Sequence, residues 1–171
     1  MMKIISGKLR GRKLISPSDN FIRPTSNRAK QMIFNTLNSL LEKRKKDYCD
    51  LTFIDFFSGI GSLGIEAISR GAENVFFIDN SSEAIKLCKK NCENQKILKF
   101  AKFLNKDIIK SNFERSLTFD IFFCDPPYMK YKLDSILKKI EVFLKINSLG
   151  VIELPLEQDF NFYSGYEIIK I

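Results

Sequence analysis

The chain has 171 residues, 44% of them hydrophobic and 28% charged, which are the proportions of one globular domain with a core of its own. It contains no histidine, which excludes histidine-based catalytic triads, and its four cysteines lack CxxC spacing, so we predict no metal site. No apolar run is long enough to cross a bilayer and the N-terminus lacks a signal-peptide core; we expect a cytoplasmic protein that does not contact membranes.

Positive charge is concentrated in the first quarter of the chain. Residues 1–46 contain twelve lysines and arginines against two acids, Asp19 and Glu42, whereas residues 47–171 contain sixteen against eighteen. A near-neutral body with a basic head predicts that a polyanion docks on the N-terminal region. The alternative, a basic tail that only aids solubility, fits less well because these charges are interleaved with signals of structure. We therefore expect one domain, with a basic N-terminal extension (1–46) and a catalytic core (47–171).

The first element in chain order is a short hairpin. Residues 4–15 alternate apolar and polar side chains around two glycines, a pattern that predicts a twisted pair of strands. Arg10, Arg12 and Lys13 would then lie near the turn or on the exposed face.

A helix follows the hairpin after an irregular link. Thr25 or Ser26 can cap it, and apolar residues recur at helical spacing to about Leu41. The basic cluster at 43–46 suits the negative end of the helix dipole, a simpler interpretation than a contact with RNA.

From residue 51 onward strands and helices alternate. We expect strands at 51–57, 74–78, 99–104, 120–124 and 150–154, and helices at 62–70, 82–95 and 132–145. Continuously apolar strands such as Leu51-Thr52-Phe53-Ile54 and Ile121-Phe122-Phe123 suit a parallel sheet covered on both faces. The pattern predicts a Rossmann-like α/β fold, a doubly wound and mostly parallel sheet whose ligands lie at the carboxyl ends of the strands. The first and fourth strands should be neighbours at the switch point.

A glycine-rich loop joins the first strand to the first helix of this core. Gly59, Gly61 and Gly64 spell GxGxxG, which alone would suit a dinucleotide. Asp55 stands four residues before the first glycine, where its charge is awkward beside a pyrophosphate but suits the ammonium and sulfonium of S-adenosylmethionine (SAM). We therefore interpret Asp55, Ser58, Gly59 and Gly61 as a SAM loop.

Two further acidic residues follow the next two strands. Asp79 closes the second strand, where a ribose-binding acid belongs. Asp107, followed by Ile108, comes after the third strand and is placed to accept a hydrogen bond from the adenine amine. The alternatives are a simple turn acid for Asp79 and a helix cap for Asp107.

The fourth strand runs directly into Asp125-Pro126-Pro127-Tyr128. Asp125 can offer its carboxylate and Pro126 its carbonyl to a planar amine, and proline stiffens the turn. Tyr128 can stack on a base taken out of its stack. Although Asp-Pro-Pro is also an ordinary strand stop, its occurrence together with the glycine loop predicts a methyltransferase acting on an exocyclic base nitrogen.

With these residues in hand, the chain resembles the RsmD family of bacterial SAM-dependent methyltransferases, which modify the N2 amine of a guanine in 16S ribosomal RNA. The motifs that carry the resemblance are Ile4-Ile5-Ser6-Gly7, Leu9-Arg10-Gly11-Arg12-Lys13-Leu14, Arg23-Pro24-Thr25 with Arg28, Ile33-Phe34-Asn35-Thr36-Leu37, the Asp55–Gly64 loop, Leu63-Gly64-Ile65-Glu66-Ala67, Ser69-Arg70-Gly71-Ala72 and DPPY.

The resemblance implies a role for each group of residues. The N-terminal Arg10, Arg12, Lys13, Arg23 and Arg28 would dock RNA. The glycine loop and the acidic residues after the second and third strands would bind SAM, and DPPY would position the amine. The partner would be 16S rRNA in the small subunit or an assembly intermediate, and a monomer is our expectation.

The C-terminus departs from the family pattern. Such sheets usually end in a hairpin of two more strands, whereas residues 166–171 supply one strand before the chain ends. Either the final antiparallel strand is missing, or the C-terminal elements lie elsewhere than we expect.

Three other functions compete with this one. A DNA adenine-N6 methyltransferase could use DPPY, but no large DNA-recognition domain is evident. An NAD-dependent oxidoreductase could use GxGxxG, but the absence of histidine and the presence of DPPY argue against it. A non-catalytic RNA-binding protein with this fold is the third.

Overall fold

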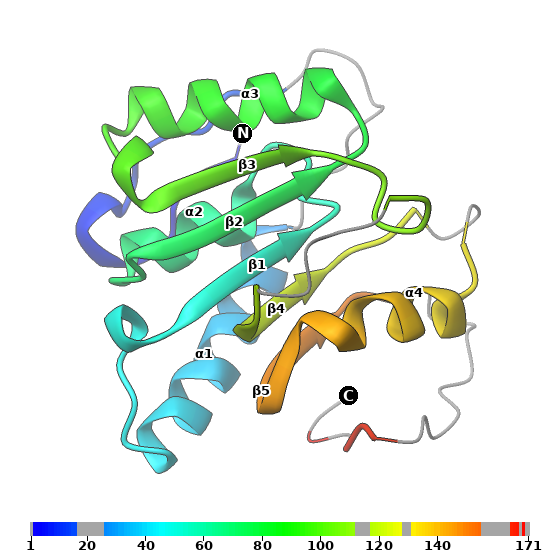
Figure 1. Cartoon of the computed structure of the whole chain (residues 1–171). Coiled ribbons are helices and arrows are strands. Elements are labelled where there is room, and N and C mark those ends of the chain that lie inside the picture. Colours follow the sequence, from blue (N-terminus) through cyan, green and yellow to red (C-terminus); the bar gives the residue numbers. More distant parts are fainter. Residues whose placement is uncertain are drawn as a thin grey trace.

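A five-stranded parallel sheet forms the centre of the molecule, in the order β3-β2-β1-β4-β5 (Figure 1). This computed structural model describes residues 2–16, 26–111, 117–127, 131–154, 165–167 and 169. The strands are β1 (Thr52–Phe56), β2 (Asn74–Asp79), β3 (Ala101–Asn105), β4 (Phe119–Cys124) and β5 (Leu144–Ile152). The first four strands confirm the predicted ones to within two residues at each end.

Helices cover both faces of the sheet, as the doubly wound prediction requires. They are α1 (Asn27–Lys43), α2 (Ser62–Ser69), α3 (Ser82–Asn94) and α4 (Leu133–Ile140). In Figure 1, α4 lies in front of the sheet, and α1, α2 and α3 lie on the opposite face. Short 3₁₀ turns occupy Gly7–Leu9, Tyr48–Asp50, Leu98–Phe100 and Glu141–Phe143.

Alternate residues of the central strands pack into two separate cores. Phe53 and Phe123 face the side of α1, α2 and α3, where the Phe123 ring lies 5.6 Å from that of Phe34 in α1. Ile54 and Phe122 face α4. Because successive side chains of a strand point to opposite faces, a strand buried on both sides needs the continuous apolar run that this sequence has.

The switch point lies between β1 and β4. From β1 the chain moves outward through β2 to β3, and then returns to place β4 on the other side of β1. The last residue of β1, Phe56, is paired with Ile78 of β2 on one side and with Cys124 of β4 on the other. Segments that leave these three strands therefore meet at one edge of the sheet, where ligands bind in open α/β folds.

The prediction of one helix over residues 132–145 was wrong at its C-terminal end. α4 stops at Ile140, one 3₁₀ turn follows, and β5 starts at Leu144. Leu144 continues the helical spacing of the apolar stripe but belongs to the strand, so spacing alone misplaced the boundary. β5 also has a register shift against β4 and a left-handed residue, Asn147 (φ 64°). Of the strand expected at 166–171, residues 166, 167 and 169 are described and are not in a strand, and the other three lie outside the described residues.

The N-terminal segment folds back on itself as a hairpin around the 3₁₀ turn Gly7–Leu9, but the described residues 2–16 contain no strand, so the predicted pair of strands is not formed. The amide of Ile4 donates to the carbonyl of Arg12 (2.9 Å), and the amide of Gly11 donates to the carbonyl of Ile4 (2.8 Å). A single antiparallel bridge joins Lys3 to Lys13. Ser26, rather than Thr25, caps the following helix by accepting from the Ala29 amide at 3.1 Å.

Side chains of α2 and α3 hold this hairpin against the core. Glu66 accepts from the amides of Ile5 (2.8 Å) and Ser6 (3.0 Å), and the Ser69 hydroxyl accepts from the Leu9 amide (3.0 Å). The apolar residues Ile4, Leu9 and Leu14 are buried in the same core as the sheet. The hairpin is therefore packed into the body of the protein.

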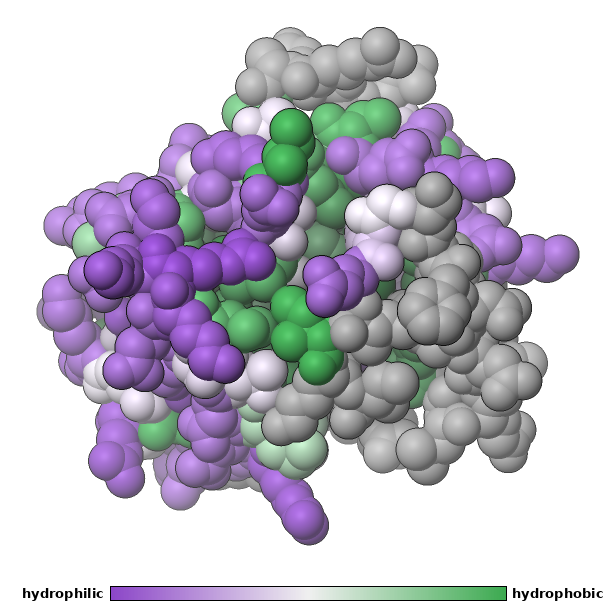
Figure 2. Space-filling view, turned by 90° about the horizontal axis from the view of Figure 1, so that it is seen from below, coloured by the Kyte–Doolittle hydropathy of each residue, from purple (hydrophilic) through white to green (hydrophobic). Residues whose placement is uncertain are grey.

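Hydrophilic side chains dominate the described part of the face seen from below, with apolar ones between them near its centre (Figure 2). Large apolar side chains exposed on the molecule include Met32, Val142 and Ile146. Among the described residues, none of the helices combines the length and the apolar character that crossing a bilayer demands.

Candidate cofactor and substrate site

The glycine-rich loop turns sharply between β1 and α2. The amide of Ser58 donates to the carbonyl of Ile78 (2.9 Å), and the amide of Gly61 donates to the carbonyl of Ser58 (2.7 Å). Gly61 is the N-cap of α2 with φ +81°, a conformation that glycine adopts without strain. A Cβ on Gly61 would overlap Sγ of Cys88, so this glycine is needed for packing as well as for the turn.

Asp55 lies inside the protein beneath this loop. Only 4% of it is exposed, and its Oδ2 accepts a hydrogen bond from the amide of Gly64 at 3.0 Å. Burial raises the pKa of Asp55 well above its usual value; the Gly64 hydrogen bond opposes this shift, and the charges of Asp125 and Asp79 add to it. The charges of Asp125 and Asp79, at two neighbouring strand ends, therefore both disfavour ionisation of Asp55. Such a cluster favours a bound cation, because a positive charge relieves the repulsion between them.

Asp79 links the glycine loop to the start of α3. Its Oδ2 accepts from the Gly59 amide at 2.9 Å, and its Oδ1 accepts from the Ser81 amide at 2.8 Å. An ionised carboxylate has about four acceptor positions, so about two remain for hydroxyl groups of a ligand. The turn role and the ligand role proposed for this residue are thus compatible.

Asp107 also makes structural hydrogen bonds. Oδ1 accepts from the amides of Ile109 (2.9 Å) and Lys110 (3.2 Å), and Oδ2 accepts from the hydroxyl of Tyr131 (3.1 Å). Partial burial would raise its pKa, but the two amide bonds, the Tyr131 bond and the Lys110 charge outweigh it and lower the pKa of Asp107. Asp107 is therefore an ionised acceptor, and Ile108 beside it is buried against the α4 side of the sheet.

The DPP segment leaves β4 directly beside the glycine loop. Asp125 is half-buried, Pro126 is buried and Pro127 is exposed. Because Cys124 is paired with Phe56, the segment that starts at Asp125 leaves the sheet next to the one that starts at Phe57. Tyr128, the fourth residue of the motif, lies outside the described residues.

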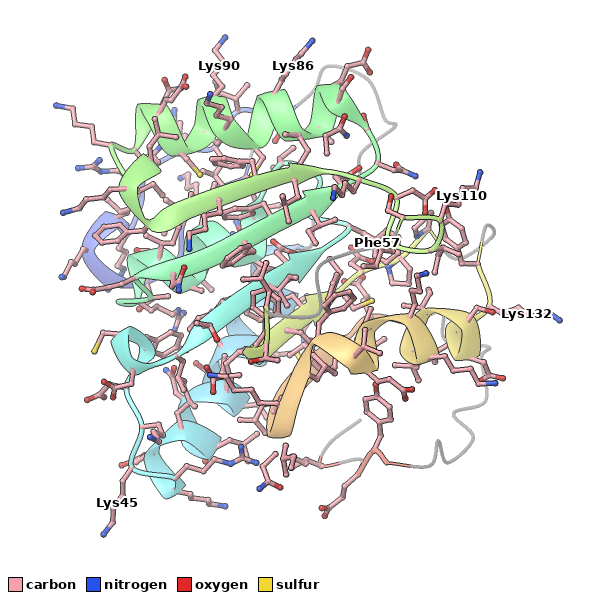
Figure 3. The ribbon with its side chains drawn as sticks, viewed as in Figure 1. Lys45, Phe57, Lys86, Lys90, Lys110 and Lys132 are labelled. Atoms are coloured by element: carbon pink, nitrogen blue, oxygen red, sulfur yellow. The ribbon has the colours of Figure 1, made fainter. Side chains whose placement is uncertain are left out.

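A shallow hollow marks the same edge between the ends of β1, β2 and β3. It is lined by Phe57, Ile78, Asp79, Asn80, Lys106 and Ile108. Figure 3 shows Phe57 at this edge, with Lys110 and Lys132 nearby, whereas Lys45 lies at the opposite end of the molecule. The predicted Asp79 and Ile108 thus both border this hollow, which has no room for a water molecule and does not by itself define a ligand pocket.

The basic N-terminal residues lie at a different place. Arg10, Arg12 and Lys13 are exposed on the hairpin, whose turn packs on Ser69 at the last residue of α2. The glycine loop is at the other end of that helix, so the two are separated by the eight residues of α2, about 12 Å. In Figure 1 this turn, in dark blue, lies where the strands begin. Arg28 is exposed in the first turn of α1, and Arg23 lies outside the described residues.

Residues 2–168 match a family model described as Conserved hypothetical protein 95. The chain belongs to this family, the RsmD family. The match includes the N-terminal hairpin and α1 as well as the sheet.

Relatives of the RsmD family cover nearly the whole chain. Ribosomal RNA small subunit methyltransferase D of Buchnera aphidicola subsp. Acyrthosiphon pisum is 32% identical over 98% of this chain and 85% of that protein. The protein of the same name from Escherichia coli is 29% identical over 82% of this chain and 67% of its own length.

Solved structures support the methyltransferase fold. The proposed methylase HI0767 from Haemophilus influenzae has a TM-score of 0.71 and 27% identity, over 94% of this chain and 85% of that one. The proposed methyltransferase yhhF from Escherichia coli has a TM-score of 0.68 and 27% identity, over 82% of this chain and 71% of that one.

Sequence reasoning missed Phe57 and Tyr131. Phe57 has a left-handed backbone (φ 60°), which is unusual for a bulky residue, and its ring lies 6.1 Å from that of Tyr131. No local pattern singles out either residue, because each looks like an ordinary apolar or turn position. Only the arrangement of the strand ends brings them together.

Proposed function

We propose that this RsmD-family protein uses SAM to methylate the N2 amine of a guanine in 16S ribosomal RNA. The observation that carries the proposal is the position of Asp125 and Pro126 at the end of β4, beside the glycine loop at the end of β1. The names of the relatives favour rRNA of the small subunit as the substrate.

The residues at the strand ends fit SAM. The charges of Asp79 and Asp125 both disfavour ionisation of the buried Asp55, which suits a ligand carrying an ammonium and a sulfonium. Asp79 keeps free acceptor positions for ribose hydroxyls, and Asp107 keeps one for an adenine amine. When bound, SAM supplies an electrophilic methyl group on its sulfonium.

Asp125 and the carbonyl of Pro126 would act on the guanine amine. The lone pair of this amine is delocalised into the ring, so the amine is a poor nucleophile. Two acceptors that take its N–H bonds hold the amine in place and stabilise the positive charge that develops on nitrogen. The amine proton becomes acidic once nitrogen is alkylated, and no strong base is required. Tyr128 would stack on the base.

RNA would dock through the basic N-terminal residues. Arg10, Arg12 and Lys13 are exposed on a hairpin that is fixed to α2 by Glu66 and Ser69. A folded RNA is larger than the length of α2, so phosphates on this hairpin and a base at the strand ends can belong to one substrate.

Nucleoside mass spectrometry tests the proposal. The protein is incubated with SAM and small ribosomal subunits from a strain that lacks this modification, and the digested RNA is analysed. We expect new N2-methylguanosine, formed about 10²–10³ times more slowly by an Asp125→Ala variant that still binds SAM. N6-methyladenosine would overturn the choice of base, and no product from a protein that binds SAM would overturn rRNA as the substrate.

A further inference from the structure

Tyr131 contacts two separate segments of the cofactor edge. It lies four residues after Pro127 and two before the start of α4. Its hydroxyl donates to Oδ2 of Asp107 at 3.1 Å, and its ring lies 6.1 Å from the ring of Phe57. Tyr131 therefore joins the chain that follows β4 to the ends of β1 and β3.

The hydrogen bonds of Asp107 leave a defined acceptor position. Oδ1 is filled by the amides of Ile109 and Lys110, which fix the carboxylate within its own turn. Oδ2 accepts only from Tyr131 among the hydrogen bonds found for the described residues, so one of its two lone pairs remains. The Tyr131 hydroxyl thus determines which way the remaining lone pair points.

Phe57 is the second residue that Tyr131 supports. Its left-handed backbone conformation is costly for an aromatic residue and persists only when neighbouring groups hold it. Phe57 lines the hollow together with Asp79 and Ile108, and Tyr131 packs against it. One side chain therefore acts on both a polar and an apolar part of the same site.

We propose that Tyr131 is a positioning residue that sets the selectivity of this site for a purine bearing an exocyclic amine. This inference rests on the proposed function, because it takes the adenine of SAM to lie at Asp107. A fixed Oδ2 accepts from an amine hydrogen and repels the carbonyl oxygen of a hypoxanthine at the same position. Loss of the Tyr131 hydroxyl leaves both lone pairs of Oδ2 open while Oδ1 stays held, so the direction from which Oδ2 accepts is no longer fixed and this discrimination weakens.

The test is calorimetric titration with S-adenosylhomocysteine and S-inosylhomocysteine. The base of the first carries the exocyclic amine, and the base of the second carries a carbonyl oxygen at the same position. For Tyr131→Phe we expect roughly 3- to 10-fold weaker binding of S-adenosylhomocysteine, the range of one lost hydrogen bond, and a smaller change for S-inosylhomocysteine. The matched control is Tyr48→Phe. It removes a hydroxyl that donates to Asn38 at 2.6 Å just before β1, at the amino edge of the sheet. It should leave both affinities unchanged.

A second variant separates positioning from general weakening. In an Asp107→Asn background, Tyr131→Phe should no longer change the ratio of the two affinities. If Tyr131→Phe leaves the ratio of the two affinities at its wild-type value, either because neither affinity changes or because both fall by the same factor, this inference is overturned and the proposed function is not. Failure of the wild-type protein to bind S-adenosylhomocysteine would overturn the proposed function and this inference with it.

Discussion

Lys30 of α1 and Glu66 of α2 are both completely buried, with 4.0 Å between Nζ and Oε2. Nζ of Lys30 also donates to the carbonyl of Lys3 at 2.7 Å, and Glu66 accepts from Nε of Arg70 at 3.0 Å. Burial lowers the pKa of Lys30 and the charge of Arg70 lowers it further, whereas the charge of Glu66 raises it. The pair joins α1, α2 and the N-terminal hairpin in the interior.

Glu66→Ala should destabilise the protein strongly. It leaves the Lys30 ammonium buried without its counter-charge and removes the acceptor for the amides of Ile5 and Ser6. We expect a loss of about 3–5 kcal/mol in the free energy of unfolding, measured by urea denaturation. The control is Lys145→Ala, which breaks the more exposed pair with Asp120 and should cost at most about 1 kcal/mol. Equal effects of the two variants would contradict this account.

The sequence predicted the strands better than the ends of the helices. Strands such as β4 are bounded by a change from apolar to polar residues that follows directly from burial. The boundary at Leu144 could not be predicted, because a leucine suits the apolar stripe of α4 and the strand equally well. The sequence could place the carboxylates that follow strands at one edge, because the carboxyl ends of the strands of a parallel sheet all lie at that edge. The support that Tyr131 gives to Asp107 depends on tertiary structure alone.

Gly64→Ala should disturb the packing of α2 on β2. A Cβ at this position would overlap the ring of Phe77, which belongs to the buried strand and cannot move away easily. Overpacking of this kind typically costs about 1–3 kcal/mol, and the reduced unfolding free energy should be seen by urea denaturation. Gly11→Ala is the comparison: a Cβ there meets no atom within 4 Å, so only the strain of its φ of +82° applies. A smaller loss for Gly64→Ala than for Gly11→Ala would refute the packing argument.

The basic hairpin should bind RNA through its phosphates. Replacing Arg10 and Arg12 by alanine removes two exposed charges, so we expect weaker binding of small-subunit rRNA. The slope of the logarithm of affinity against the logarithm of salt concentration should also become less steep by up to about two, roughly one for each lost phosphate contact. SAM affinity should not change. Lys45→Ala with Lys46→Ala removes the same charge at the far end of α1, where Figure 3 shows Lys45, and should have little effect. If both double variants lost the same RNA affinity, net charge alone would determine binding.

Asp55 should make stability and SAM binding depend on pH in opposite ways. Its folded-state pKa is raised well above 3.8, mainly by burial, so the folded state holds the proton more tightly than the unfolded state. Its contribution to stability is present at acid pH and is lost as pH rises from about 4 through the raised pKa. A bound cation favours the ionised form, so SAM should bind more tightly as pH rises over the same range.

Calorimetry in two buffers of different ionisation enthalpy measures the proton that SAM binding releases from Asp55. Asp55→Asn keeps the shape of the side chain and an oxygen for the Gly64 amide. In this variant the linked proton release should disappear, and the stability should vary less as pH rises above about 4. Undiminished proton release in Asp55→Asn would assign the titration to another group.

Asp125 should be needed more for chemistry than for SAM affinity. It is half-buried at the end of β4, and its charge is close enough to Asp55 to raise the pKa of that carboxyl. Asp125→Ala removes an acceptor that stabilises charge on the reacting nitrogen, and loss of one such group typically lowers kcat by about 10²–10³. Asp125→Asn keeps one acceptor oxygen without the charge and should fall between the wild type and the alanine variant.

The measurement is single-turnover methylation of small ribosomal subunits, with SAM affinity determined separately by calorimetry. A fall in the rate at saturating SAM that is much larger than any change in SAM affinity assigns Asp125 to the transition state, because a group that only binds cofactor would change affinity first. Removal of a negative charge next to Asp55 should also lower the pKa of Asp55, and the proton release on SAM binding would then shift to lower pH. A near-normal rate for Asp125→Ala would show that the amine is held by other acceptors.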